Sequence, residues 1–319
     1  MIMTVRGPVD ASEMGITLTH EHVLVDFIGA DSISNKRWNS KEVIAKVLPY
    51  LHDVMKAGCR TLVECTPAYL GRDPVLLKTL SDSTGLNILT NTGFYGAGDN
   101  KYLPSYAFRE TAEELADRWI REWKLGIDGT PVRPGFIKIG VSGDSLSGLH
   151  RKLVRAAALT HLSSGLTIAS HTGPARLAFE EIETLMNEGV SPDAFIWVHA
   201  QNEKDAGEHV KAARMGAWVS FDGIDDDNLD QYVRLLGNMK EKGVLNRVLL
   251  SHDAGWYHPG EPGGGRFRGY VTLFQKLLPL LRGNGFTEEE IKELLVVNPA
   301  KAFAVQVRKL TKPLSLLND

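Results

Sequence analysis

The sequence predicts a single (β/α)8 barrel of the TIM type with a C-terminal helix, spanning residues 1–319. Three observations predict this fold. Short apolar runs alternate with amphipathic stretches along almost the whole chain, a pattern typical of βαβ units and a parallel sheet. No change in composition marks a linker between domains, and no G-x-G-x-x-G sequence follows a strand as in a dinucleotide-binding fold. Eight units within about 270 residues fit one barrel.

Eight apolar runs are expected to form the barrel wall: Gly15–Val25, Arg60–Pro67, Asn87–Gly93, Gly135–Val141, Leu166–Thr172, Phe195–Ala200, Trp218–Phe221 and Arg247–Asp253. Helical periodicity lies between them, for example in 40–57. Thr111 with Glu114 predicts a capping box at the start of a helix over 111–125, and Thr287 with Glu290 predicts another before the last helix. In such a barrel, functional side chains gather at the C-terminal ends of the strands.

The composition is that of a globular protein and excludes several functions. The chain has 36 Lys and Arg against 39 Asp and Glu, a formal net charge of −3, so the basic excess of a general nucleic-acid binder is missing. No apolar run reaches the roughly 18–20 residues that span a bilayer, so no membrane association is expected. Residues 1–15 lack the pattern of a secretory signal, and two cysteines make no disulfide framework. We therefore expect a cytoplasmic protein.

Histidines close three of the predicted strands. His20 and His22 lie two residues apart at the end of the first strand, so they share a face, while Glu21 points to the other side. His171 and His199 end the fifth and sixth strands. A metal ion would occupy imidazole nitrogens that otherwise need partners in the barrel. The alternative for each histidine alone is a hydrogen-bonded core residue.

An acid and a lysine complete this constellation. Asp253 ends the eighth strand on the inward face, while His252 is expected to turn toward the helices. Lys138 lies in an apolar strand whose two isoleucines face the helices, so it projects into the barrel, where burial favours its neutral amine. Lys138 then either pairs with Asp253 or Glu64, or has added carbon dioxide to form a carbamate that bridges two divalent metals.

The order of these residues resembles the phosphotriesterase family of the amidohydrolase superfamily. The resemblance covers nearly the whole chain and rests on six positions and three phrases: His20, His22, Lys138, His171, His199 and Asp253, with Gly15–His22, Asn91–Tyr95 and Asn298–Lys301. It implies a more buried metal held by His20, His22 and Asp253. It also implies a more exposed metal held by His171 and His199, with carboxylated Lys138 (N6-carboxylysine) and a hydroxide as bridges, and a homodimer.

The predicted activity is the metal-dependent hydrolysis of a small molecule, with Asp253 as the catalytic proton carrier. Histidine and carboxylate ligands favour two Zn²⁺ ions, while Mn²⁺, Co²⁺ and Fe²⁺ fit the same ligands. The resemblance implies a lactone as substrate, including a phosphorylated sugar lactone. The alternatives are an organophosphate triester and a cyclic amide of the dihydroorotase or hydantoinase type. A noncatalytic barrel is disfavoured, because all six matching positions are present.

Four further residues are candidates for substrate contacts. Tyr95 matches the tyrosine beside the metal centre in the family's lactonases, the alternative being a rim aromatic. Trp256 comes soon after the last ligand in a long loop. Arg266 and Arg268 lie further along this loop, where barrel enzymes frequently bind phosphate. We hypothesise that they hold an anionic tail, the alternative being a solvent-facing lid. The acidic run 225–227 stands where the family's acyl-homoserine-type lactonases commonly carry an arginine.

Overall fold

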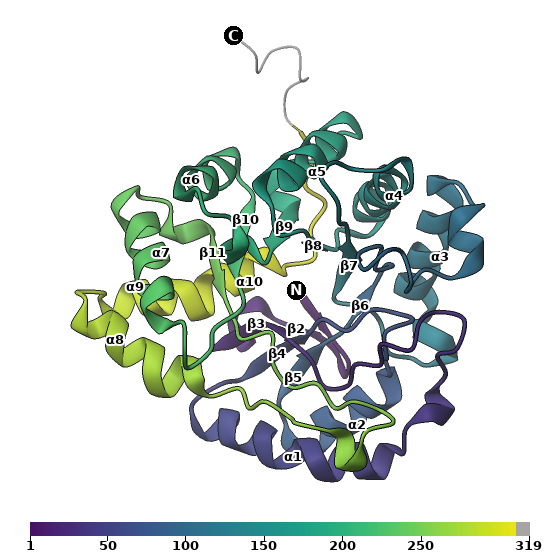
Figure 1. Ribbon diagram of the computed structural model, residues 1–319, viewed down its shortest axis with the longest axis horizontal. Helices are drawn as coiled ribbons and strands as arrows, with labels where there is room; N and C mark the ends of the chain where they lie inside the picture. Colours follow the sequence, from purple (N-terminus) through teal and green to yellow (C-terminus); the bar gives the residue numbers. More distant parts are fainter. Residues whose placement is uncertain (311–319) are drawn as a thin grey trace.

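The computed structural model describes residues 1–310, and residues 311–319 of the expected domain lie outside the described part. Parallel strands form a central ring and helices surround it (Figure 1). The strands of the ring are β3 (Thr17–Glu21), β4 (Thr61–Glu64), β5 (Asn87–Leu89), β6 (Asn91–Thr92), β7 (Phe136–Gly140), β8 (Ile168–His171), β9 (Phe195–Val198), β10 (Trp218–Phe221) and β11 (Val248–Leu250). Each lies within a predicted run, and the (β/α)8 fold is confirmed.

The parallel strands hydrogen-bond in two arcs, β3-β4-β5 and β6 through β11. The third predicted strand is interrupted at Thr90, which separates β5 from β6. At the other seam, the backbone N–H of Asp253 donates to the carbonyl of His20 at 3.1 Å, and Thr19 Oγ1 donates to the carbonyl of Leu250 at 3.1 Å. These bonds bring the end of the eighth strand beside the end of the first.

The outer layer consists of α1 (Ser40–Lys56), α2 (Pro74–Thr84), α3 (Ala112–Leu125), α4 (Gly148–Ser164), α5 (Ala175–Asn187), α6 (Ala206–Met215), α7 (Leu229–Glu241), α8 (Leu278–Gly283), α9 (Glu288–Lys292) and α10 (Asn298–Ala302). Both predicted capping boxes are present at the starts of α3 and α9. The expected C-terminal helix is divided by a π-helical turn between α9 and α10. Within residues 1–310, none of the helices combines the length and apolarity that crossing a bilayer requires.

A short hairpin that the sequence did not predict closes the bottom of the barrel. It consists of β1 (Ile2–Thr4) and β2 (Gly7–Val9), which pair antiparallel. Ile2 packs inside the ring with Phe136 and Phe303, whose rings meet edge-to-face at 5.5 Å. This apolar cluster fills the bottom of the barrel, and the polar side chains of the catalytic site lie at the C-terminal ends of the strands.

Gly93, directly after β6, shows how closely two strands approach. Its φ is +113°, and a Cβ there would lie 2.2 Å from the carbonyl oxygen of Lys138. We expect Gly93→Ala to lower the free energy of unfolding by about 4 kcal/mol or more, because backbone and not a flexible side chain must move. Urea unfolding measures this. Gly189→Ala is the matched control, since φ is +82° but nothing lies within 4 Å; its cost should be about 1–2 kcal/mol. Equal costs would contradict the steric argument.

Candidate active site

A small cavity of about 70 Å³, here called the catalytic cavity, opens at the C-terminal ends of the strands. All six positions predicted from the sequence line it, together with Tyr95 and Trp256. The remaining wall is mainly apolar, and the full lining is His20, His22, Val25, Phe27, Cys65, Pro67, Leu70, Tyr95, Lys138, His171, His199, Asp253 and Trp256. The structure therefore brings together the residues that the strand phases placed on the inward face.

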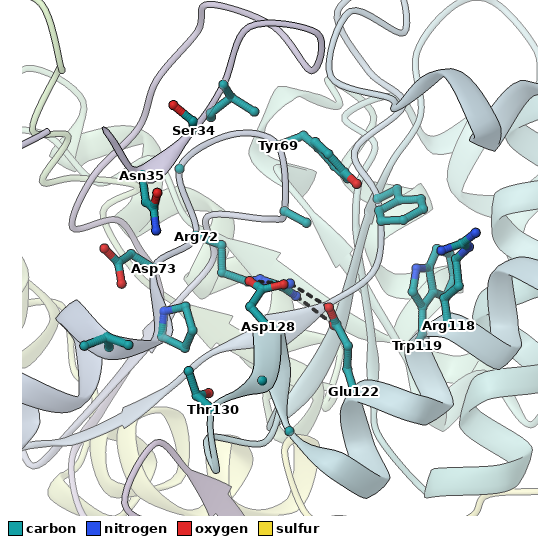
Figure 2. A pocket seen from close by; sticks show the side chains of 18 of the residues that line it. Ser34, Asn35, Tyr69, Arg72, Asp73, Arg118, Trp119, Glu122, Asp128 and Thr130 are labelled. Carbon is teal, nitrogen blue, oxygen red and sulfur yellow. Dashed lines mark hydrogen bonds and ion pairs between the residues drawn. The ribbon is translucent and has the colours of Figure 1, made fainter. Parts of the chain in front are cut away.

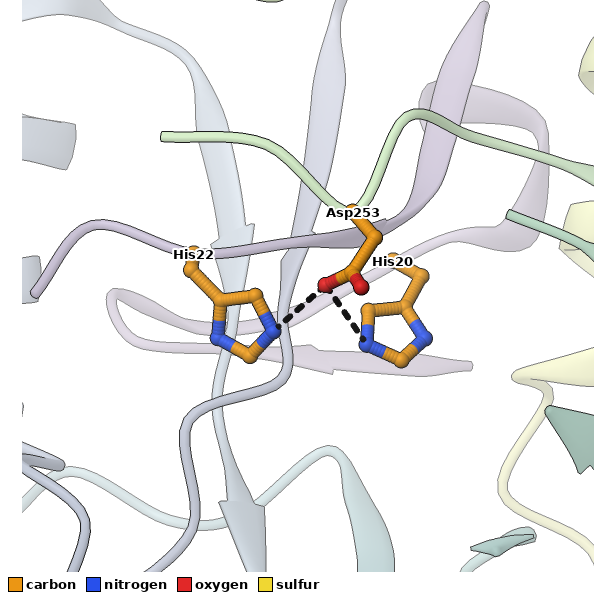
Figure 3. A group of neighbouring side chains, drawn as sticks. All are labelled: His20, His22 and Asp253. Atoms are coloured by element: carbon orange, nitrogen blue, oxygen red, sulfur yellow. Dashed lines mark ion pairs between the residues drawn. The ribbon is translucent and has the colours of Figure 1, made fainter. Parts of the chain in front are cut away.

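His20, His22 and Asp253 form the deeper group (Figure 3). Asp253 Oδ1 lies 3.0 Å from His22 Nε2 and 3.6 Å from His20 Nε2. Burial opposes the charge of Asp253, but the hydrogen bond from His22 and the electrostatic interaction with the nearby imidazoles of His20 and His22 hold the pKa of this carboxyl below its usual range. Burial, aided by the nearby Lys138, lowers the pKa of His20 to about 4. His20 is thus a neutral imidazole at pH 7, as a metal ligand must be.

His171 and His199 form a second pair beside the first group. Their ring centroids are 4.4 Å apart, and His199 lies 5.1 Å from His20. Burial and the neighbouring His199 and Lys138 hold the pKa of His171 well below its usual range. The backbone of His199 has a φ of +62° and that of Asp253 a φ of +52°. Non-glycine residues adopt such angles rarely and at some energetic cost.

Lys138 is buried at 2% exposure in the wall of the same cavity. Its Nζ has no hydrogen-bond partner in the described part of the chain, and neither Asp253 nor Glu64 pairs with it there. An unpartnered buried donor costs about 1–3 kcal/mol. A carbamate on Nζ would instead present two oxygens to the histidine groups. The donor set of four imidazoles, one carboxylate and this lysine fits two divalent metals.

Asp222, which the sequence analysis did not single out, supports both histidine groups from behind. This fully buried carboxylate follows β10. Its Oδ1 accepts a hydrogen bond from His199 Nδ1 at 2.6 Å, and its Oδ2 lies 3.3 Å from His20 Nδ1. Such partners orient a ligand and select its tautomer. Its position directly after the seventh strand was the signal in the sequence that could have identified it.

Two buried glutamates support the deeper group. Glu21 accepts from His252 Nδ1 at 2.7 Å and from the backbone N–H groups of His252 and Ala254 at 3.0 and 2.8 Å, on either side of Asp253. Glu64 accepts the hydroxyl of Thr66 at 2.5 Å, and Thr66 Oγ1 lies 2.8 Å from His22 Nδ1. These carboxylates hold the main chain of one predicted ligand and the ring of another.

Glu181 on α5 holds the residues that flank His171. It is fully buried, and its two oxygens lie within hydrogen-bond distance of the hydroxyls of Ser170 at 2.5 Å and Thr172 at 2.6 Å. Burial raises the pKa of Glu181 to about 8 from an ordinary value of 4.5. The folded protein therefore binds a proton here that the unfolded chain releases above pH 4.5. The resulting stability is complete below that pH and is lost as the pH rises through 8.

We expect Glu181→Gln to flatten this part of the pH dependence, because the amide stays neutral. Urea unfolding of metal-free wild type and variant at pH 5 and at pH 9 tests this. At pH 5 the two proteins should have similar free energies of unfolding. At pH 9 the variant should be the more stable by on the order of 2–4 kcal/mol. Parallel curves for wild type and variant would contradict a protonated carboxyl at position 181.

The two arginines of the long eighth loop do not reach the catalytic cavity. Arg266 is exposed. Arg268 donates to Asp225 Oδ2 at 2.7 Å, to the carbonyl of Asp253 at 2.7 Å and to the carbonyl of His252. Its guanidinium thus holds the turn that carries Asp253, an arrangement that does not support the anionic-tail hypothesis. The acidic run is also paired within the protein, since Asp226 forms an ion pair with Lys276 at 2.7 Å.

Arg268→Ala should lower kcat/KM by on the order of tenfold for neutral and anionic substrates alike, because the turn of Asp253 loses its donors. Arg266→Ala, an exposed arginine of the same loop, is the matched control and should leave kcat/KM unchanged. Steady-state kinetics with one neutral and one phosphorylated lactone separates the cases. A loss confined to the phosphorylated lactone would restore the anionic-tail hypothesis.

A barrel with four histidines, a buried lysine and an acid at its C-terminal mouth defines a metal-dependent hydrolase. The model of the phosphotriesterase family matches residues 1–303, and the chain belongs to this family. Lactonases are among the proteins it resembles, as the following comparisons show.

Two curated relatives and one solved structure illustrate the similarity. A "phosphotriesterase homology protein" of Escherichia coli (strain K12) is 29% identical over 293 residues, covering 91% of this chain and 98% of the relative. A "phospho-furanose lactonase" of Mycoplasmopsis synoviae (strain 53) is 27% identical over 339 residues, covering 99% and 95%. A mutant of a Deinococcus radiodurans PTE-like lactonase superposes with a TM-score of 0.86 at 29% identity, covering 95% and 100%.

Proposed function

We propose that the chain is a binuclear-metal lactonase acting on small, uncharged lactones. The observation that carries the proposal is the catalytic cavity, in which all six predicted ligand positions and Tyr95 face one space of about 70 Å³. Two of the similar proteins bear the name lactonase. The small volume favours a compact substrate, and the histidine-rich wall favours hydrolysis.

His20, His22 and Asp253 would hold one metal ion and His171 with His199 the other, with carboxylated Lys138 between them. Zn²⁺ is the proposed metal, given imidazole and carboxylate donors. When bound, the pair supplies Lewis acidity toward a carbonyl oxygen and lowers the pKa of a bound water. Asp222, Glu64 and Glu181 keep the surrounding side chains in place, as their hydrogen bonds indicate.

Asp253 and Tyr95 would perform the proton transfers and the orientation of the substrate. The ionised Asp253 Oδ1, at the centre of the site, can accept a proton from the attacking water and carry it to the leaving alkoxide. The Tyr95 ring lies 5.0 Å from that of His171. Burial raises the pKa of the Tyr95 hydroxyl, so it stays protonated and can donate to an oxygen of the ester group. These roles require the substrate to lie between Asp253, which follows β11, and Tyr95, which follows β6.

The cavity wall favours an uncharged and partly apolar substrate. Its lining contains Val25, Phe27 and Leu70 and no arginine. Phe27 and Trp256 form an aromatic pair at 5.5 Å, and the buried Trp256 Nε1 has no partner within the described residues. We propose that this N–H donates to a substrate oxygen. Apart from the proposed metal ions, a phosphate tail would meet no cationic side chain in this lining once Lys138 is carboxylated, so the neutral lactone is preferred over the phosphorylated sugar lactone.

A substrate panel on protein reconstituted with Zn²⁺ and bicarbonate tests the proposal. It compares γ-butyrolactone and a longer alkyl lactone with a phosphorylated sugar lactone, an aryl phosphotriester and a cyclic imide. The expected result is that kcat/KM is highest for a neutral lactone and that Asp253→Asn abolishes turnover. A higher kcat/KM for the phosphotriester or the imide would assign that activity instead. Turnover of the phosphorylated lactone alone would overturn the preference for an uncharged substrate.

A further inference from the structure

A second cavity opens on the flank of the barrel, between α2, α3 and the loop after β4 (Figure 2). We call it the outer pocket and define it by Trp38, Tyr69, Arg72, Glu122 and Asp128. Its volume is about 680 Å³, within the usual range for small-molecule sites. None of its lining residues belongs to the catalytic cavity. The outer pocket is therefore a separate space that the hydrolytic site does not account for.

A buried ion pair forms the floor of the outer pocket (Figure 2). The Arg72 side chain is only 3% exposed, and its Nη1 and Nη2 donate to the two carboxylate oxygens of Glu122 at 2.9 and 2.7 Å. Asp128 Oδ2 lies 3.7 Å from Arg72 Nη2, and this aspartate is 65% exposed. Desolvation makes buried pairs of this kind poor sources of stability. A ligand in the outer pocket can reach this group of charges at the exposed carboxylate of Asp128.

Backbone strain is concentrated in the two cavities. Among non-glycine residues of the described chain, seven have a positive φ: Tyr69, Asp99, Asn100, Asp128, His199, Asp253 and Trp256. The last three line the catalytic cavity, while Tyr69 at +65° and Asp128 at +52° line the outer pocket. The Asp, Asn and His residues among the seven adopt this conformation more readily, so the two that stand out are Tyr69 in the outer pocket and Trp256 in the catalytic cavity. Strain of this kind is typical of functional sites, and a tyrosine in this region is a true outlier.

The lining of the outer pocket indicates the kind of ligand. Three arginines and three acids balance one another: Arg72, Arg118, Arg121, Asp73, Glu122 and Asp128. This balance favours a ligand without net charge. Tyr69 and Trp38 are half-buried and offer aromatic surface, which stacks with a planar ring. The hydroxyls of Tyr69 and Tyr106 lie 2.7 Å apart, so one O–H is used between them and the other can donate.

We propose that the outer pocket is a second ligand site for an uncharged planar ring that both donates and accepts hydrogen bonds, as a purine nucleoside does. The ligand's donor would meet the Asp128 carboxylate, and its acceptor would meet the free tyrosine hydroxyl. The ring would lie against Tyr69 and Trp38. This proposal does not depend on which ester the catalytic cavity hydrolyses.

The two cavities share one wall, the loop 67–73. Pro67 and Leu70 line the catalytic cavity, whereas Tyr69 and Arg72 line the outer pocket. Arg72 Nη1 also donates at 2.8 Å to the carbonyl of Asn91. The Asn91 side chain in turn donates to the carbonyl of Thr66, whose hydroxyl contacts His22. A ligand that displaces Tyr69 or Arg72 is therefore expected to change the KM of hydrolysis.

Adenosine is the probe, titrated into the full-length metal-loaded protein and followed by isothermal calorimetry. We expect saturable binding at one site, retained in Asp253→Asn and weakened about tenfold in Asp128→Asn. Asn accepts the left-handed backbone at position 128, so this change removes the charge and one acceptor oxygen without straining the main chain. Asp99→Asn, an exposed left-handed aspartate outside the pocket, is the matched control and should bind as wild type does.

Three results would overturn the proposal: no saturation up to roughly 10 mM, equal affinity in wild type and Asp128→Asn, or binding that Asp253→Asn alone abolishes. Benzoate and benzylammonium test the charge of the ligand. If either binds more tightly than adenosine and loses affinity in Asp128→Asn, the pocket takes a charged ligand and not an uncharged one. Saturating adenosine should change the lactone KM at least about twofold. An unchanged KM would contradict the inferred coupling between the two cavities.

Discussion

Lys138→Met is expected to lower the metal content and abolish hydrolysis while making the metal-free protein more stable. The thioether fills the space of the lysine stem but cannot form a carbamate, so the bridge between the two predicted metals is lost. Elemental mass spectrometry of the digested protein should show fewer than two metal ions per chain. The value of kcat/KM should fall by roughly a thousandfold or more. The stability should rise by about 1–3 kcal/mol, because a buried amine without a partner is removed.

The opposite signs of the two effects make this experiment selective. A damaged fold would lower activity and stability together. Urea unfolding of metal-free wild type and variant therefore serves as the internal control. Full metal content in Lys138→Met would refute the bridging role of the lysine. A loss of stability by several kcal/mol would show that Nζ has a favourable partner in solution.

Asp222→Asn should weaken metal binding about 10–100-fold and destabilise the metal-free protein by about 3–5 kcal/mol at pH 7. The amide cannot supply the charge that His20 and His199 face at 3.3 and 2.6 Å. Competition with a chelator gives the metal affinity, and urea unfolding gives the stability.

Asp227→Asn is the matched control for Asp222→Asn, since Asp227 lies five residues later in the same loop and is exposed. Its effects should stay within about 0.5 kcal/mol. If both variants lose metal equally, the loss comes from the charge of the loop and not from the contacts of Asp222. If neither loses metal, Asp222 has a purely structural role.

The period of a β-strand explains why so much of the site could be predicted. Side chains two residues apart share a face, so the phase of each apolar strand placed His20, His22, Lys138 and Asp253 inward without knowledge of the tertiary fold. The structure places all four in one cavity. The same alternation predicted that His252 turns away, and its ring indeed bonds Glu21 and the backbone N–H of Leu273.

Contacts between distant segments could not be predicted in this way. By analogy with other barrels, the sequence position of Arg268 suggested a phosphate site. In the structure its partners are Asp225 and Asp253, which lie on other turns. The hairpin of β1 and β2 is held mainly by the barrel floor, and its six strand residues show no alternation strong enough to identify it. Asp222 resembled a loop residue because only the neighbouring strands reveal its two histidine partners.

The ion pairs between the seventh and eighth loops have a consequence for engineering. Arg268 with Asp225, and Lys276 with Asp226, tie the segment after β10 to the segment after β11. A chimera that receives only one of these segments from a relative would leave two carboxylates or two cations without their counterparts beside the turn of Asp253. The segments after β10 and β11 therefore form one exchangeable module, and grafts that transplant them jointly keep both ion pairs, which single grafts lose.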